Sequence, residues 1–268
     1  MKYFYLFIII VIIYFIFKNN KIENFLDSEF KKVVIIPYRD REKHLNYFIE
    51  NTIPLFNKYL KNYKVVVIEQ GNNFPFNRGI LINIGYDIFK DRTKYIITHD
   101  VDINPYKNGI KKFYNKKVDD NTIMGIYTSF CNTLGGIIKM KANTFKKING
   151  FPNNFWGWGL EDIELQKRAE TYKIKITKNI KSKDKERTKY FKIFNDVNDR
   201  KLSKDYFDRM NYIKSIYKKG NIFYKNRNIK RMKKHIFKSG LKNLKYKIIK
   251  ETKLDENVSL FKVDFEYI

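Results

Sequence analysis

The sequence predicts an α/β protein with a Rossmann-like sheet flanked by helices, and two observations support this fold class. First, short β-branched runs alternate with stretches of helical spacing over residues 32–172. Second, charged and polar residues follow these runs at the points where strands would end. Because ligands in such sheets bind at the carboxyl ends of the strands, we expect a binding site at that edge.

The predicted elements follow one another in a regular order. The runs at 32–37, 65–68 and 95–98 predict buried parallel strands, and the first of them ends at a proline. Further strands are expected at 123–127 and 136–140. Helices are expected at 41–60, 77–90 and 160–172.

The composition indicates a folded chain and limits the classes of function. Among the 268 residues, 23 Phe and 20 Tyr can fill a core, which excludes a disordered chain. A single cysteine, Cys131, excludes a disulfide scaffold. The formal net charge is +27, yet 45 of the 55 basic residues are Lys and only 10 are Arg. Because base and phosphate recognition depends on the arginine fork, we do not expect nucleic acid to be a partner.

Residues 1–17 are expected to form a membrane segment, because positions 3–17 carry no charge and are apolar or aromatic. A helix of 15 residues spans about 22 Å, less than the ~30 Å hydrocarbon core, so a signal peptide also fits by length. No small-residue cleavage pattern follows. We therefore expect an uncleaved signal anchor, then a short stem at 18–30, in a single-pass type II protein facing a Golgi- or ER-type lumen.

Two acidic residues directly follow the third strand. Asp100 and Asp102 alternate at the strand end, so both carboxylates can approach one cation. Mg²⁺ and Mn²⁺ favour such oxygen ligands and leave positions for substrate phosphates. An Asp-x-Asp pair also occurs by chance in acidic loops, so this motif alone is weak.

A second cluster spans residues 155–162, with the sequence FWGWGLED. It contains both tryptophans, Trp156 and Trp158, set among glycines. An exposed indole stacks on sugar rings, and glycines allow a loop to move. Glu161 and Asp162 fall in the first turn of the expected helix. The competing interpretation is an acidic helix N-terminus beside a core tryptophan.

Taken together, five ordered segments resemble the β-1,4-galactosyltransferase family (glycosyltransferase family 7), and more closely its xylosylprotein-type members. These segments are Ile36-Pro37-Tyr38-Arg39-Asp40-Arg41, Phe76-Asn77-Arg78 with residues 81–86, His99-Asp100-Val101-Asp102, Gly135-Gly136, and residues 149–159 with Glu161-Asp162. The histidine before Asp100 favours the xylosylprotein type. The resemblance implies a GT-A fold and a metal-dependent, inverting transfer of galactose from a UDP-sugar, forming a β-linkage on a glycan or glycoprotein acceptor.

The resemblance also implies a role for each matching position. Donor-binding residues would be Pro37, Tyr38, Arg39, Arg41, Phe76, Arg78, Asp100, Gly136 and Trp158. Asp102 would bind Mn²⁺, with Mg²⁺ as an alternative. Asp162 would be the catalytic base on the acceptor hydroxyl, and Glu161 and Trp158 would position the acceptor. This arrangement is chemically coherent, because the metal neutralises charge on the leaving diphosphate while a carboxylate removes the proton.

The sequence departs from the family pattern in three places. The family's later metal-binding histidine is missing, and Asp196 aligns with its position, which would give an all-oxygen metal site. Leu160 and Ile163 differ from the family on the acceptor side of the Glu-Asp pair. Thr133 replaces a tyrosine that crowds the donor sugar, so UDP-GalNAc is an alternative donor to UDP-Gal.

Residues 31–195 would then form the GT-A catalytic domain, and residues 196–268 its basic C-terminal part. Positions 171–268 carry 29 basic and 11 acidic residues, either as a solvated face or as a surface for lipids or acidic glycans. The alternative function is a non-catalytic, membrane-tethered protein on a transferase-like fold that binds anionic glycan or nucleic acid. A salt-dependent affinity for polyanions without nucleotide-sugar binding would favour that alternative.

Overall fold

The computed structural model describes residues 30–129, 133–194, 204–217 and 225–266. Several features expected from the sequence lie outside the described residues. These are the membrane segment at 1–17, the stem up to residue 29, Cys131 and Asp196. Within the described ranges, no helix is long and apolar enough to cross a bilayer.

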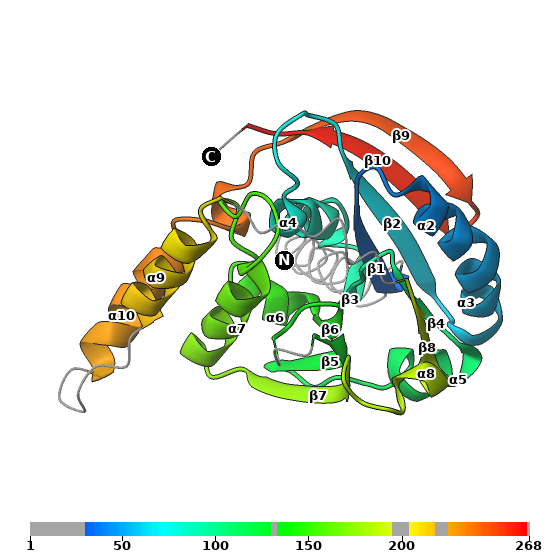
Figure 1. Cartoon of the computed structure of the whole chain (residues 1–268), viewed down its shortest axis with the longest axis horizontal. Helices are drawn as coiled ribbons and strands as arrows, with labels where there is room; N and C mark the ends of the chain where they lie inside the picture. The colour runs from blue at the N-terminus through cyan, green and yellow to red at the C-terminus, as the bar shows by residue number, and fades with distance from the viewer. Residues whose placement is uncertain (1–29, 130–132, 195–203, 218–224, 267–268) are drawn as a thin grey trace, which may run out of the picture.

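The described residues contain one mixed sheet of eight strands, in the order β7-β5-β6-β3-β1-β2-β10-β9 (Figure 1). The strands are β1 (Phe30–Tyr38), β2 (Tyr63–Gln70), β3 (Thr93–Thr98), β5 (Thr122–Thr128), β6 (Ile137–Lys141), β7 (Lys175–Lys181), β9 (Lys247–Asp255) and β10 (Val258–Asp264). β1 pairs in parallel with β2 and β3, whereas β6 runs antiparallel to β3 and β5. The Rossmann-like mixed sheet predicted from the sequence is confirmed.

The central strands are continuous apolar runs because packed elements cover both faces of the sheet. In β1, Val34 and Ile36 enter one core, whereas Val33 and Ile35 enter the core on the opposite face. All four side chains are fully buried. Successive residues of a strand point to opposite faces, so a strand buried on both sides must be apolar throughout.

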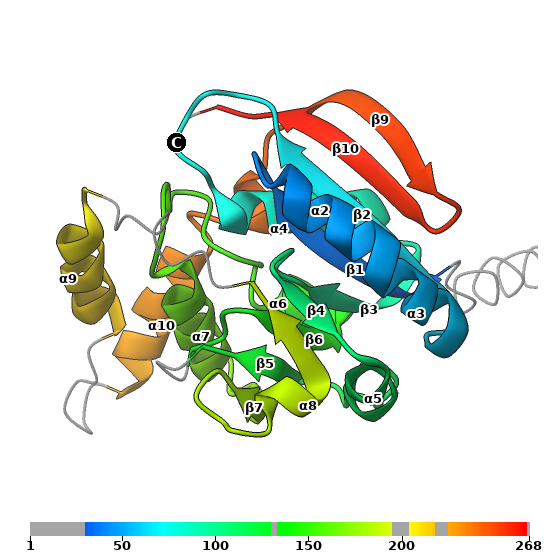
Figure 2. The ribbon, with the colours of Figure 1, turned by 45° about the vertical axis from the view of Figure 1, so that its right-hand side comes forward.

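Helices lie on both faces of the sheet (Figures 1 and 2). One face carries α2 (Glu42–Tyr47), η1 (Phe48–Thr52), α3 (Ile53–Tyr59), α5 (Lys107–Gly109), η2 (Ile110–Tyr114) and α8 (Arg187–Tyr190). The opposite face carries α4 (Arg78–Phe89), α6 (Ala142–Lys147) and α7 (Glu161–Thr171). The helix expected at 41–60 is therefore interrupted by a π-helical segment, η1. A small antiparallel sheet joins β4 (Ile103–Pro105) to β8 (Phe191–Ile193).

The C-terminal region adds two helices beside α7 and two strands to the main sheet. α9 (Tyr206–Tyr217) and α10 (Lys225–Ile236) lie beyond α7, on the side away from α2 and α3 (Figures 1 and 2). A small apolar cluster joins them to the loop before α7. After η5 (Leu241–Asn243), β9 and β10 extend the main sheet, with β10 parallel to β2.

Candidate active site

The candidate residues gather where β1 and β3 end, and Arg78 lies at the centre of this group. Arg78 is the first residue of α4, and the preceding Asn77 caps that helix by accepting the Ile80 N–H at 3.0 Å. The Asn77 backbone N–H donates to Gln70 at the end of β2, and its side-chain amide donates to the carbonyl of Asn153. These bonds fix the helix start, and with it the origin of the arginine side chain.

The Arg78 guanidinium links three of the expected donor and acceptor residues. Its Nε and Nη2 each lie 2.8 Å from Oδ1 of Asp100. Nη2 also donates to the carbonyl of Gly136 at 3.4 Å, and Nη1 lies 3.8 Å from Oε1 of Glu161. Nη1 is buried and has no hydrogen-bond partner within the described residues. The site therefore holds an unused cationic donor, a feature that suits an anionic ligand.

Glu161 begins α7 and is only 13% exposed. Burial and the neighbouring Asp162 raise the pKa of Glu161 to about 7, against the opposing effect of Arg78. A carboxyl group titrating there changes charge in the physiological range.

Asp162 is held by two hydrogen bonds. Its Oδ1 accepts the backbone N–H of Ile163 at 2.8 Å, and its Oδ2 accepts the hydroxyl of Thr133. Gly135 packs against the same carboxylate, since a Cβ there would lie 2.8 Å from Oδ2. A side chain at Gly135 would push the Asp162 carboxylate from its position.

The loop before α7 separates the two tryptophans. Trp156 is buried and packs against the rings of Phe74 and Phe265, at 5.7 Å in each case. Trp158 is 49% exposed. Gly157 lies between them with a positive φ, and its N–H donates to the carbonyl of Phe76 at 2.8 Å. Each of the two interpretations of this cluster therefore applies to one tryptophan, and only Trp158 offers an indole face to a ligand.

The segment around Asp102 combines a structural histidine with an acidic strand end. His99 is buried and bonded to the Tyr114 hydroxyl at 2.7 Å, and burial lowers its pKa to about 4, so it stays neutral. The carbonyl of Asp102 accepts the N–H of Phe194 at 2.9 Å. The chain two residues before Asp196 therefore lies beside Asp102. The described residues contain no cluster of three His, Cys, Asp or Glu that could hold a metal ion.

The remaining donor candidates lie at the end of β1. Pro37 pairs with β2, and Tyr38 is the last residue of the strand. Arg39 donates to the carbonyl of Phe74 at 2.6 Å, and its guanidinium lies 5.5 Å from the ring centre of Phe76. Arg41 directly precedes α2 and accepts two backbone N–H bonds with its carbonyl. The segment that is expected to bind uridine diphosphate thus lies next to Phe76.

Two family models match this chain. The N-terminal region of glycosyl transferase group 7 matches residues 25–114, and the N-terminal domain of galactosyltransferase matches residues 122–195. The chain belongs to the glycosyltransferase group 7 family. This confirms the resemblance read from the five ordered segments.

Curated relatives of this group 7 protein are β-1,4-galactosyltransferases. β-1,4-Galactosyltransferase 4 of Cricetulus griseus is 34% identical over 152 residues, which cover 54% of this chain and 44% of that protein. β-1,4-Galactosyltransferase 7 of Drosophila melanogaster is 30% identical over 230 residues, which cover 83% of this chain and 65% of that protein. The match therefore spans less than half the length of the first relative.

Solved structures show the same fold. The catalytic domain of Drosophila β-1,4-galactosyltransferase 7 in complex with xylobiose has a TM-score of 0.66 and 26% identity, covering 88% of this chain and 94% of that one. A mutant of that enzyme in complex with manganese, UDP-Gal and xylobiose has a TM-score of 0.67 and 24% identity, with the same coverage. The group 7 chain thus has the glycosyltransferase fold expected from its sequence.

The structure adds contacts that the sequence did not reveal. Arg209 of α9 donates to the carbonyl of Trp156, and so joins that helix to the tryptophan loop. Glu164 and Arg168 of α7 form an ion pair at 3.2 Å with both side chains almost completely buried. The i, i+4 spacing of Glu164 and Arg168 could have indicated their ion pair from the sequence. No sequence pattern indicated the contact between Arg209 and Trp156. Leu160, noted as a departure, has a left-handed φ of 78° and is buried.

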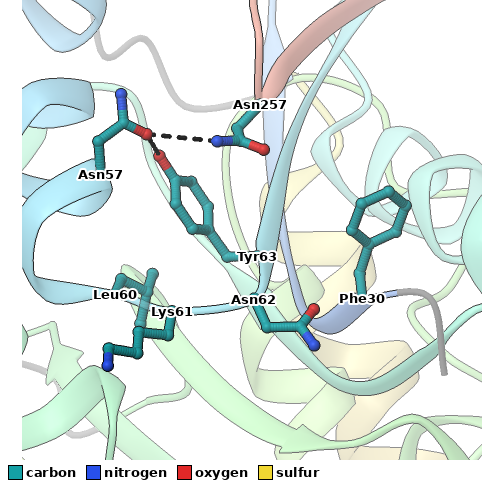
Figure 3. A pocket seen from close by; sticks show the side chains of 7 residues that line it. All are labelled: Phe30, Asn57, Leu60, Lys61, Asn62, Tyr63 and Asn257. Carbon is teal, nitrogen blue, oxygen red and sulfur yellow. Dashed lines mark hydrogen bonds between the residues drawn. The ribbon is translucent and has the colours of Figure 1, made fainter. Parts of the chain in front are cut away.

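A separate pocket of about 340 Å³ lies at the amino-terminal ends of β1 and β2, whereas the candidate site lies at the carboxyl ends of β1 and β3 (Figure 3). Its lining residues are Phe30, Asn57, Leu60, Lys61, Asn62, Tyr63 and Asn257. They lie near the starts of β1 and β2 and at the turn between β9 and β10. The lining has no carboxylate, so it lacks the groups to which the family resemblance assigns metal binding and base catalysis.

Proposed function

We propose that this group 7 protein is a metal-dependent, inverting glycosyltransferase that moves galactose or GalNAc from a UDP-sugar to a sugar hydroxyl of a glycan or glycoprotein. The observation that carries the proposal is the convergence of Arg78, Asp100, Glu161 and Asp162 at the carboxyl edge of the sheet. A cation, two buried or half-buried carboxylates and a base candidate are the groups that such a transfer needs. Nothing in the comparisons favours the non-catalytic alternative.

We assign the donor site to the carboxyl end of β1 and the start of α4. The Drosophila enzyme binds UDP-Gal, which supports a nucleotide sugar here. Nη1 of Arg78 makes no hydrogen bond within the described residues, although it lies 3.8 Å from Glu161, and Arg39 lies beside the Phe76 ring. Arginine binds phosphate oxygens in a bidentate manner, and an aromatic ring provides a stacking surface for a base.

The carboxylates suit a hard divalent cation, and the Drosophila structure contains manganese. We propose that Asp102 holds Mn²⁺ together with Asp196, which lies outside the described residues. Phe194 supports this pairing, because its backbone N–H bonds to the carbonyl of Asp102. When bound, the metal would neutralise the charge that develops on the leaving diphosphate.

Asp162 is the proposed base. It would take the proton of the acceptor hydroxyl as the acceptor oxygen bonds to the sugar C1 and the bond from C1 to the diphosphate oxygen breaks. Attack opposite the leaving group inverts the configuration, so an α-linked donor gives a β-linked product. Glu161 would orient the acceptor, and the exposed indole of Trp158 would cover the sugars.

The remainder of the acceptor would occupy a groove of about 590 Å³ between α7 and α9. Its lining residues are Ile163, Lys167, Met210, Ile213, Lys214, Ser215 and Tyr217. Ile163, which follows Asp162 on α7, belongs to this lining. The Drosophila enzyme binds xylobiose, which supports a saccharide acceptor.

A turnover assay tests this function. The protein is incubated with UDP-Gal or UDP-GalNAc, Mn²⁺ and xylobiose, and released UDP is measured. We expect UDP release that Asp162→Asn reduces about 10²- to 10⁴-fold while UDP binding persists, because general-base catalysis contributes that much. The matched control is Asp119→Asn, at an exposed position before β5. If no UDP-sugar turns over with Mn²⁺ or Mg²⁺, the proposal is wrong.

We further propose that residues 1–17 anchor the protein to a membrane, with the catalytic domain in a lumen. Protease treatment of sealed vesicles tests this topology. A protected domain is expected, and digestion without detergent would contradict the type II orientation.

A further inference from the structure

The most informative unassigned contact in the molecule lies behind the proposed base. Thr133 is buried, and its hydroxyl donates to Oδ2 of Asp162. The Ser129 hydroxyl lies 2.7 Å from the Thr133 oxygen. A hydroxyl has one proton to donate, and an ionised carboxylate only accepts. With the Thr133 proton directed at Asp162, Ser129 must donate its own proton to Thr133, so the two hydroxyls form a chain polarised toward the carboxylate.

We propose that the Thr133 hydroxyl is a positioning group for Asp162, holding the carboxylate aimed at the acceptor hydroxyl, with Ser129 supporting it. This inference rests on the proposed function. It differs from a role in donor choice, because it concerns the hydroxyl of Thr133 and not the size of the side chain.

The geometry leaves Asp162 few other partners. Its second oxygen accepts the backbone N–H of Ile163, which fixes one end of the carboxylate. Gly135 has no side chain beside Oδ2, and a Cβ there would lie 2.8 Å from it, so this position leaves room for the carboxylate and offers it no side-chain hydrogen-bond donor. Thr133 is therefore the side chain that sets the direction of Oδ2, and a hydrogen bond to an ionised group is stronger than a neutral one.

The charges that face Asp162 come from several elements. Glu161 precedes it on α7, Arg78 approaches from the start of α4, and Lys178 approaches from β7. Asp100 interacts with Glu161 from the end of β3. None of these charges changes when Thr133 is replaced by a neutral residue. A change in the pH dependence of such a variant therefore reports the hydroxyl itself.

Two substitutions of Thr133 distinguish the effect of its hydroxyl group from the effect of its side-chain volume. Thr133→Val keeps the shape and removes the hydroxyl, whereas Thr133→Ser keeps the hydroxyl and removes a methyl group. Ser129→Ala removes only the supporting donor. The matched control is Thr171→Val on α7, whose hydroxyl bonds to the carbonyl of Lys167 and makes no contact with Asp162.

The experiment measures kcat, KM and the pH–rate profile of the full-length protein with UDP-Gal and UDP-GalNAc. We expect Thr133→Val to lower kcat roughly 10-fold, in line with a lost hydrogen bond to a charged group, and to leave the donor KM within about twofold. The acidic limb of the profile should move to higher pH. Thr133→Ser should restore both values, Ser129→Ala should give a smaller effect, and Thr171→Val should match the wild type.

Each contrary result is decisive. A wild-type kcat in Thr133→Val overturns the inference, as does a Thr133→Ser variant as slow as Thr133→Val. A change in the Gal-to-GalNAc ratio of Thr133→Val without a fall in kcat assigns the residue to donor choice alone. If the wild type transfers no sugar, the proposed function fails, and ¹³C NMR titration of the Asp162 carboxyl then decides. Equal midpoints in wild type and Thr133→Val overturn the inference, and a higher midpoint in the variant supports it.

Discussion

Replacing Glu161 by Gln should stabilise the protein at pH 8 while it abolishes transfer. Glu161 is 13% exposed, and burial beside Asp162 raises its pKa to about 7 from an ordinary 4.5. The ionised form therefore costs folding free energy. The difference of 2.5 pH units corresponds to about 3 kcal/mol once the group is fully ionised. Because Asp162 shares this effect, we expect a gain of about 1–3 kcal/mol from the neutral amide.

The sign of the pH dependence follows from proton binding. Between pH 4.5 and 7 the folded state holds a proton at Glu161 that the unfolded state has released. Wild-type stability from this group is therefore highest below pH 4.5 and falls as the pH rises toward 7. The advantage of Glu161→Gln should be absent at pH 4.5 and complete at pH 8.

Urea denaturation at pH 4.5, 6 and 8 measures this difference in the free energy of unfolding. The matched control is Glu170→Gln on the same helix, where the carboxylate is 44% exposed and pairs with Lys167. That variant should stay within about 0.5 kcal/mol of the wild type at every pH. A Glu161→Gln variant that is no more stable at pH 8, or equally stabilised at all three pH values, would refute the reasoning.

Three further predictions concern other parts of the protein. Asp102→Asn should weaken Mn²⁺-dependent UDP binding at least ~10-fold by calorimetry, whereas Asp119→Asn, at an exposed position, should not. Burial lowers the pKa of Lys139 to about 7, so the unfolded state binds an extra proton above that pH and stability rises with pH. Lys139→Met should remove up to ~1.4 kcal/mol per pH unit of that rise between pH 7 and 9 in urea denaturation, and an unchanged slope would contradict the assignment. Tyr217→Phe should cost about 1.5–3 kcal/mol, because its hydroxyl donates to the buried Glu164, and a loss under 0.5 kcal/mol in thermal denaturation would contradict this.

Much of the fold was predictable because each central strand is buried on both faces. In the runs at 32–37, 65–68 and 95–98 the polar residues Lys32 and Thr98 stand at the ends, and such continuous apolar runs are typical of strands buried on both faces. The order of the strands was less accessible. Residues 258–264 pair with β2 although they follow it by a long stretch of chain, and no local pattern encodes such a pairing.

The candidate site was predictable where its residues follow strands or begin helices. Spacing predicted Asp100 at a strand end and Glu161 in a first helical turn, and the family resemblance implied that they share one site. Contacts that depend on the folded loops were not predictable. The Thr133 hydroxyl reaches Asp162 across 29 positions, and Trp156 differs from Trp158 only in which way the backbone turns at the intervening glycine.

The position of β10 has a consequence for how the molecule is made. Val258 pairs with Val65, so this edge of β2 stays uncovered until residues 258–264 have emerged from the ribosome. Until then β2 presents unpaired backbone groups beside the apolar core, a state open to aggregation. We therefore expect the incomplete sheet to benefit from protection during translation, and a reporter or affinity tag is better placed where it cannot delay the arrival of residues 258–264.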